Sequence, residues 1–278
     1  MAKMKSIIKD ILPPALMRMI IRNPLRRYGW SGNYPSWQAA QLEATGYDSA
    51  VILEKVKNSL LKVKNGEAVY ERDSVLFDRI EYDWPVLAGL MWVAGQHQGR
   101  LSVLDFGGSL GSSFFQNRKF LSALKGVEWS VVEQTHFVKA GVSHFQDEQL
   151  KFFATCEQCV AERKPNVILL SSVLSYIEKP YELLEYLSAL QIEFMIIDRL
   201  PVIKGDRDQI KLQKVNPVIY PVTYPAWFFS KSGFKKRIEQ ILEISVIYNC
   251  QISLDLPTDF IGLVLKCNRS KNGKNGIN

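Results

Sequence analysis

The sequence lacks a long apolar run. No stretch of about 18 consecutive apolar residues occurs in the chain, so we predict no transmembrane helix. Residues 1–27 are basic and contain apolar stretches, but Lys9, Asp10, Pro13 and Pro14 interrupt them and no small-residue cleavage site follows. We therefore expect no signal peptide in this segment.

Residues that bind metals are also scarce, with three histidines and four cysteines among 278 residues. Cys156 and Cys159 form a C-x-x-C pair, but Cys250 and Cys267 are not spaced as a second ligand pair. We therefore predict no metal site. Because the C-x-x-C pair follows a strand-like run, a redox role stays open beside the simpler interpretation, free thiols in a reducing cytosol.

The charge is unevenly distributed along the chain, whose net charge is +7. Residues 1–27 contribute +6 and residues 266–278 contribute +4, which leaves −3 for residues 28–265. A mildly acidic body with basic ends argues against a nucleic-acid-binding face. The basic N-terminal segment could contact an anionic membrane as a peripheral element, and a solvated basic arm is the alternative.

The first hundred residues have a mainly helical pattern, with two helices around Gly46 and another at about 84–96, and no internal repeat. From residue 101 onward the pattern alternates between strands and helices, which predicts βαβ units and a parallel sheet. The predicted strands are 101–105, 128–133, 150–154, 167–171 and 194–198, and the predicted helices are 112–125, 135–146, 156–163 and 180–190.

Two features complete the predicted α/β fold. The strands are continuously apolar, which is typical of a sheet that is covered on both faces. Residues 242–254 and 260–268 have strand patterns joined by a short turn, with no room for a helix between them. We expect these two segments to form an antiparallel hairpin at the edge of the sheet.

The stretch "LSVLDFGGSLGSSF" (101–114) predicts a strand, a glycine turn and the start of a helix. It is neither G-x-G-x-x-G nor a P-loop, and an acid, Asp105, stands two residues before the first glycine. A carboxylate there suits a cationic or amino-bearing ligand and repels a pyrophosphate. The next strand ends in Glu133, whose carboxylate can accept hydrogen bonds from both hydroxyls of a ribose.

These motifs carry a resemblance to a known family. "VLDFGGSLG", the strand ending in Glu133, "VILLSSVLSYIEKPYELL" and the closing hairpin together resemble a class I S-adenosylmethionine-dependent methyltransferase over residues 85–267. Ser109 replaces the middle glycine of the family's usual D-x-G-x-G-x-G motif. The resemblance implies a Rossmann-like, mostly parallel sheet with the C-terminal antiparallel hairpin, a helical N-terminal extension and S-adenosyl-L-methionine as cofactor.

The resemblance also implies which residues bind that cofactor. The methionine part would lie against the glycine turn, the ribose against Glu133, the adenine near Gln134 and Thr155, and the sulfonium beside the end of the fourth strand. The implied cofactor-binding residues are Asp105, Gly107, Gly108, Ser109, Gly111, Glu133, Gln134, Thr155, Ser171 and Ser172.

Methyl transfer to an alcohol needs a group that removes the acceptor's proton. Our first candidate is Asp198, because the end of the fifth strand is the usual place for such groups; a local ion pair with Arg199 is the alternative. His136 and Tyr176 are further candidates. The alternative for His136 is that it borders the cofactor, and the alternative for Tyr176 is that it is a core aromatic residue. The candidate substrate-binding residues are Tyr70, Arg72, Asp73, Arg199 and Trp227.

The alternatives for these groups are structural. Asp105 could cap its turn, Glu133 could be a solvated acid at a strand end, and Asp73 could be a helix cap. The apolar segment "YPVTYPAWFF" (220–229) could be a substrate lid or a core-packed insertion.

A narrower resemblance concerns the N-terminal part. "GNYPSWQAA", "GYDSAVIL" and "YERDSVLFDRIEYDWPVLAGL" are similar to an uncharacterised group of methyltransferases found among bacterial surface-polysaccharide biosynthesis proteins. It implies a cytoplasmic enzyme that methylates a sugar hydroxyl. The expected organisation is a basic segment (1–28), a helical substrate or cap region (29–98), a methyltransferase domain (99–268) and a flexible tail (269–278).

Two other functions stay open at this point. One is a nicotinamide-dependent sugar oxidoreductase. The acid before the glycines and the absence of a G-x-G-x-x-G motif argue against it. The other is a catalytically silent binding or scaffold protein that keeps the fold. The sequence does not indicate the oligomeric state.

Overall fold

The computed structural model describes residues 28–45, 49–72, 74–216, 219, 221–250, 252 and 258–267. The basic residues 1–27, the tail 269–278 and the candidate residue Asp73 lie outside this set. Within the part described, no helix has the length and apolar character needed to cross a bilayer.

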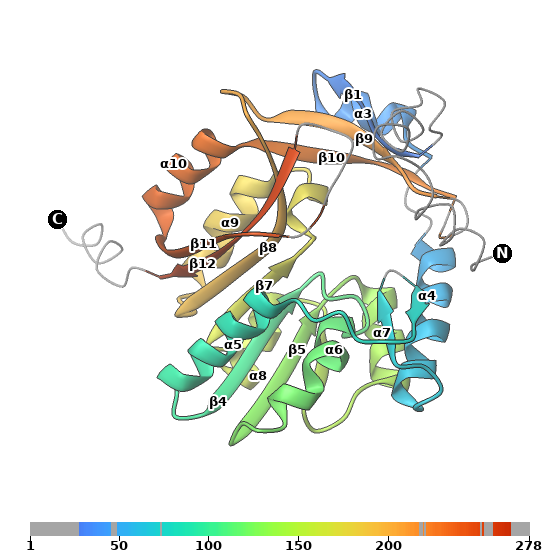
Figure 1. Ribbon diagram of the computed structural model, residues 1–278, viewed down its shortest axis with the longest axis vertical. Coiled ribbons are helices and arrows are strands. Elements are labelled where there is room, and N and C mark those ends of the chain that lie inside the picture. The colour runs from blue at the N-terminus through green and yellow to red at the C-terminus, as the bar shows by residue number, and fades with distance from the viewer. Residues whose placement is uncertain are drawn as a thin grey trace, which may run out of the picture.

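The main sheet has the strand order β6-β5-β4-β7-β8-β12-β11 (Figure 1). Strands β4 to β8 pair in parallel, whereas β12 is antiparallel to both β8 and β11. This mostly parallel α/β sheet with an antiparallel C-terminal hairpin confirms the predicted fold class and the hairpin. The strands are β4 (Arg100–Phe106), β5 (Gly126–Val132), β6 (Leu150–Phe153), β7 (Val167–Ser171), β8 (Phe194–Ile203), β11 (Glu243–Asn249) and β12 (Thr258–Lys266).

Helices cover both faces of this sheet. The apolar residues of α5, α6 and α7 belong to one buried cluster, and those of α8, α9 and α10 belong to another. Their bounds agree closely with the predicted helices, except that α10 was not predicted. They are α5 (Trp84–Gln96), α6 (Ser112–Leu121), α7 (Thr135–His144), α8 (Cys156–Arg163), α9 (Pro180–Ala189) and α10 (Lys231–Ile241), with a short 3-10 helix η1 (Leu174–Tyr176) before α9.

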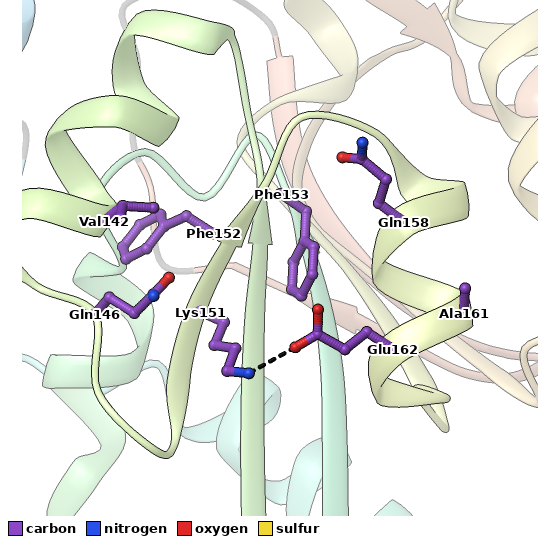
Figure 2. A pocket seen from close by; sticks show the side chains of 8 residues that line it. All are labelled: Val142, Gln146, Lys151, Phe152, Phe153, Gln158, Ala161 and Glu162. Carbon is purple, nitrogen blue, oxygen red and sulfur yellow. Dashed lines mark hydrogen bonds and ion pairs between the residues drawn. The ribbon is translucent and has the colours of Figure 1, made fainter.

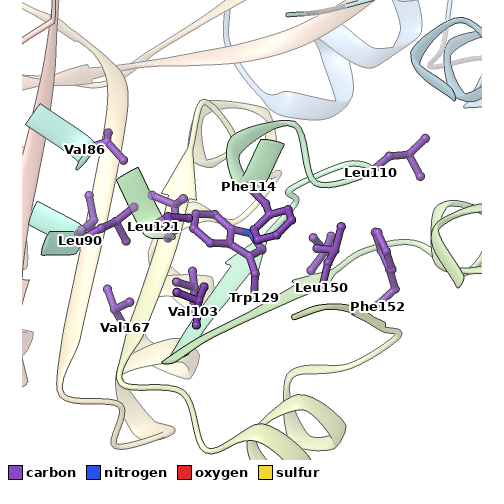
Figure 3. Close-up of a cluster of buried hydrophobic side chains, with 14 of the residues drawn as sticks. Val86, Leu90, Val103, Leu110, Phe114, Leu121, Trp129, Leu150, Phe152 and Val167 are labelled. Carbon is purple, nitrogen blue, oxygen red and sulfur yellow. The ribbon is translucent and has the colours of Figure 1, made fainter. Parts of the chain in front are cut away.

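The alternation of side chains explains why the strands are apolar throughout. In β4, Val103 packs into the first cluster and Leu104 into the second. In β7, Leu169 packs into the first cluster and Ile168 into the second. Each strand therefore buries both its faces. Figure 3 shows the first cluster, in which Trp129, 0% exposed, lies among side chains from α6, β4 and β6.

A second group of strands extends the molecule beyond the carboxyl edge of the main sheet (Figure 1). Here β1 (Gly29–Tyr34) pairs with β9 (Gln209–Lys214), β9 pairs with β10 (Thr223–Ser230), and β10 pairs in parallel with the last residues of β8. The apolar segment 220–229 thus mostly forms a strand, and Phe228 and Phe229 are fully buried. The core-packed interpretation of this segment is therefore correct.

The N-terminal region is less helical than its pattern predicts. It contains α3 (Trp37–Glu43) and α4 (Ser49–Lys64), as expected, but also β1 and the hairpin of β2 (Tyr70–Arg72) and β3 (Val75–Phe77). Strands of three residues are too short to establish a period of two along the sequence. These two strands were therefore missed, and β1, with six residues, was missed as well.

The C-x-x-C pair lies in the core. Cys156 and Cys159 are free thiols on α8, and both are buried. Burial raises the pKa of the Cys156 thiol to about 11 and that of the Cys159 thiol to about 12. Because the thiolate is the reactive form, these values argue against the redox alternative.

The first prediction concerns α4, which buries Ile52, Val56 and Leu60 at helical spacing in the first cluster. Leu60→Ala should lower the free energy of unfolding by about 2–5 kcal/mol, because it leaves a cavity in the core. Leu42→Ala is the matched control, since Leu42 is 89% exposed and should change stability by less than about 0.5 kcal/mol. Urea titration followed by circular dichroism measures both; equal small effects would show that α4 is not part of the core.

Candidate functional site

The glycine turn begins where β4 ends. Gly107 has φ +69° and its N–H donates to the Val132 carbonyl at 2.9 Å, and Gly111, with φ +93°, precedes α6. Ser109, at the position where the family motif has glycine, also has a positive φ of +56°. Left-handed backbone favours glycine, so the motif reflects backbone geometry.

Asp105 is buried inside this turn, only 1% exposed. Its carboxylate accepts a hydrogen bond from the Trp129 indole N–H at 2.9 Å. A Cβ on Gly108 would lie 2.4 Å from the Asp105 carboxyl carbon, so the absence of a side chain there makes room for the acid. Burial raises the pKa of Asp105 to about 7; the Trp129 hydrogen bond opposes this, the nearby Glu133 charge adds to it, and Arg199 opposes it.

Glu133 follows β5 directly and lies at the adjacent strand end. Its carboxylate accepts the Gln134 N–H at 2.7 Å. Burial raises the pKa of Glu133, and hydrogen bonds from the backbone of Gln134 and Ser109 oppose that rise. The second acid is therefore connected to the glycine turn through Ser109, and Gln134 itself is exposed before α7.

The space beside Gly107 is filled by protein. A Cβ there would lie 2.5 Å from the Val173 Cγ2, in a backbone conformation that strains other residues. Substitution of Gly107 would therefore disturb the fold as well as any ligand, and it does not isolate cofactor binding.

Ser171 and Ser172 end β7 and join a network with β8. The Ser171 hydroxyl donates to the Asp198 carboxylate at 3.0 Å and accepts from the Arg199 guanidinium at 2.5 Å. The Ser172 N–H donates to the Asp198 carbonyl at 3.1 Å. Arg199 also forms an ion pair with Asp198, its Nε lying 3.0 Å from Oδ2, so the local ion pair considered for these two residues is present.

A cavity of about 1220 Å³ lies at this carboxyl edge, between the N-terminal region and the β9–β10 strands. One wall comes from residues 79–85, and the other comes mainly from β8, β9 and β10. Its lining contains five residues with charged side chains and several aromatic rings. The charged residues are Arg72, Arg79, Glu81, Asp83 and Arg199, and the aromatic residues include Trp30, Tyr82, Trp84, Tyr176, Tyr224 and Phe228.

Four of the predicted residues line this cavity: Arg72, Ser172, Tyr176 and Arg199. Arg72 forms an ion pair with Glu81 at 3.2 Å. The Tyr176 hydroxyl donates to the Gln213 side-chain carbonyl at 2.7 Å, and its ring packs edge-on against Tyr224.

Two predicted substrate residues do not reach the cavity. Trp227 is on the opposite face of β10 from Ala226 and Phe228; its ring stacks on Trp37. Tyr70 is buried, and its hydroxyl accepts a hydrogen bond from the Gln116 amide at 3.0 Å. For Trp227 the alternation of side chains along β10 decides the direction, and the sequence alone did not reveal the strand register.

Thr155 and His136 also lie outside the cavity lining. The Thr155 hydroxyl accepts the Gln158 N–H at 3.3 Å, so it caps α8. His136 lies in the first turn of α7 with its ring against Phe137, and among the described residues its Nε2 is buried without a hydrogen-bond partner.

Sequence reasoning missed Asp83 as a functional candidate. Its side chain caps α5, accepting the Val86 N–H at 3.4 Å, and it also lines the cavity. An acid before a Trp-Pro pair signals only a helix start. The sequence offered no signal that this helix start would face Asp198.

A second, shallower depression of about 690 Å³ lies over β6 at the edge of the main sheet (Figure 2). The Lys151 ammonium and the Glu162 carboxylate, 2.6 Å apart, form an ion pair across it. A charged lysine on an edge strand opposes pairing with another strand. This accounts for the depression without a ligand.

No family model and no curated protein matches the chain, and the solved structures named below resemble it distantly. The N-terminal domain of EvdMO1, crystallised with S-adenosylhomocysteine and D-fucose, is 11% identical over 80% of this chain and 98% of that chain, with a TM-score of 0.44. Magnesium protoporphyrin IX methyltransferase from Synechocystis PCC 6803 is 16% identical over 66% and 80%, with a TM-score of 0.43. The Burkholderia thailandensis 1,6-didemethyltoxoflavin-N1-methyltransferase is 12% identical over 80% and 91%, with a TM-score of 0.40. Similarity at this distance assigns no ligand or substrate.

The second prediction concerns the proton on Asp105. In the native protein this carboxyl keeps its proton up to about pH 7, whereas an unfolded chain releases it near pH 4. Between these values the native state binds more protons, so the free energy of unfolding should fall as the pH rises. Asp105→Asn should remove the contribution of Asp105 to this decrease in the free energy of unfolding, which is at most about 1.4 kcal/mol per pH unit.

Urea unfolding of the two proteins at about pH 5 and pH 8 measures the difference. Asp78→Asn, at an exposed acid, is the control and should keep the pH dependence of the unsubstituted protein. An identical pH dependence in Asp105→Asn would show that Asp105 is ionised throughout this range.

Proposed function

We propose that the protein is an S-adenosylmethionine-dependent methyltransferase. The observation that carries the proposal is the pair of acids, Asp105 and Glu133, at the ends of adjacent strands of a class I sheet and connected through the glycine turn. A carboxylate at Glu133 suits a ribose diol, and one at Asp105 suits the cationic end of the methionine part. When bound, the cofactor supplies an electrophilic methyl group.

The polar side chains at this edge fit such a cofactor and disfavour a dinucleotide. The Glu133 carboxylate beside the turn would repel a pyrophosphate, which is the group that a Rossmann turn normally cradles. The buried Nε2 of His136, without a partner among the described residues, adds a hydrogen-bonding atom near Glu133. These features favour the methyltransferase over the nicotinamide-dependent oxidoreductase.

We further propose that the acceptor is a sugar hydroxyl, methylated during assembly of a surface polysaccharide. The cavity combines aromatic faces, such as Trp30, Tyr82 and Tyr224, with polar groups such as Arg72 and Gln116. Sugar rings stack on aromatic faces while their hydroxyls take hydrogen bonds, so this mixture supports the proposal. Arg72 and Arg199 are the substrate contacts kept from the sequence analysis, Tyr176 is the catalytic candidate that also lines the cavity, and Asp73 stays a candidate.

The third prediction tests the cofactor. S-Adenosylhomocysteine should bind with a micromolar dissociation constant, on the order of −8 kcal/mol. Glu133→Gln should weaken binding about tenfold or more, because the amide replaces the charged acceptor of the ribose. Glu239→Gln, at an exposed acid on α10, is the matched control and should bind normally. Calorimetry measures all three, and binding of NAD without binding of S-adenosylhomocysteine would contradict the proposal.

We also propose that the protein is cytoplasmic and that the basic residues 1–27 contact an anionic membrane surface. The support is their charge of +6.

The fourth prediction is that replacing Arg22, Arg26 and Arg27 by glutamine reduces binding to vesicles containing phosphatidylglycerol. Each basic residue contributes about 1 kcal/mol near such a surface, an attraction that salt screens. Vesicle flotation at low and high salt is the measurement, and unchanged binding would contradict the contact.

A further inference from the structure

Asp198, the first candidate for removing the acceptor's proton, is already engaged by its neighbours. It is 2% exposed. Its Oδ2 contacts the Ser171 hydroxyl and the Arg199 Nε, each at 3.0 Å. Its Oδ1 accepts from the Tyr248 hydroxyl at 3.1 Å and from the Cys250 thiol at 3.6 Å. A carboxylate held in this way has no exposed oxygen with which to meet a substrate.

Asp83 has the complementary arrangement. It lies at the N-terminus of α5, its side chain is only partly buried, and it lines the cavity. Its side chain makes a long cap contact, Oδ1 to the Val86 N–H at 3.4 Å, and a hydrogen bond with the Asp198 carboxyl. With fewer contacts than Asp198, it keeps oxygen lone pairs that can face a ligand in the cavity.

The two acids act on each other. Asp198 and Arg199 face Asp83 from β8, and Tyr248 and Cys250 face it from β11 and the residue that follows. Burial and the neighbouring Asp198 charge raise the pKa of Asp83 to about 6, and Arg199 opposes the rise. A base with a pKa near the working pH removes a proton more effectively than an ordinary aspartate does.

We propose that Asp83 faces the methyl-transfer centre and is the residue that takes the acceptor's proton, while Asp198 holds it in position. This inference rests on the proposed function and goes further by assigning a catalytic residue. As the acceptor oxygen bonds to the methyl carbon, the sulfur–methyl bond breaks and its electron pair stays on sulfur. The hydroxyl proton passes to the Asp83 carboxylate, so charge and atoms balance.

The proposal has a test that needs no knowledge of the acceptor. S-Adenosylmethionine carries a sulfonium charge that S-adenosylhomocysteine lacks, and a positive charge beside Asp83 favours its ionised form. At about pH 6, binding of S-adenosylmethionine should therefore release more protons than binding of S-adenosylhomocysteine. Calorimetry in two buffers of different ionisation enthalpy counts these protons. Because both ligands share the same amino group, any release from Asp105 that this group causes cancels in the difference.

Asp83→Asn should abolish the difference in proton release while both ligands still bind, since asparagine also caps a helix and keeps α5 intact. Asp78→Asn, at an exposed acid five residues earlier, should retain it. Equal proton release by the two ligands in the unsubstituted protein, or a difference that persists in Asp83→Asn, would overturn the role of Asp83. Failure of both ligands to bind would instead refute the proposed function itself.

Discussion

Strand β8 has to pair with two different strands along one edge, and the site depends on how it passes from one to the other. Its first half pairs with β7 as far as Asp198, and its last two residues pair with β10. The described residues show no partner strand on that edge for Arg199, Leu200 and Pro201. Arg199 has a left-handed φ of +54° there, and Pro201 has no N–H to leave unpaired.

This change of partner places charge where a sheet interior would exclude it. Asp198 and Arg199 lie at the gap between β7 and β10, so they pair with each other and with Ser171. On the other edge, β12 pairs with β8 from Phe194 to Ile203, with a register shift between Ile261 and Leu263, and β11 brings Tyr248 to the same carboxylate. The Tyr248 ring lies directly over Gly262 of β12, where a Cβ would lie 2.0 Å from its Cζ. The glycine is therefore required for the tyrosine to reach Asp198.

The sequence predicts the parts of the molecule that local patterns determine. The βαβ alternation, the hairpin and the glycine turn depend on periodicity and on backbone geometry at residues such as Gly107 and Gly111. The β9–β10 extension could not be predicted in this way, because its strands follow a charged interruption in β8 and pair with β1, about 180 residues away in the chain. The direction of Trp227 depends on a strand register that no local pattern reveals.

The same distinction separates the two halves of the candidate site. The cofactor residues lie at the ends of β4 and β5, within one short stretch of sequence, so their types and spacing could be interpreted together. The acceptor cavity is built from segments that are far apart, including residues 79–85, the end of β8 and the inner face of β10. Asp83 and Asp198 meet only because α5 packs over β8, where Gly89 lies against Ile196. Changes in the cavity segments can therefore alter the acceptor site without changing the cofactor residues at the ends of β4 and β5.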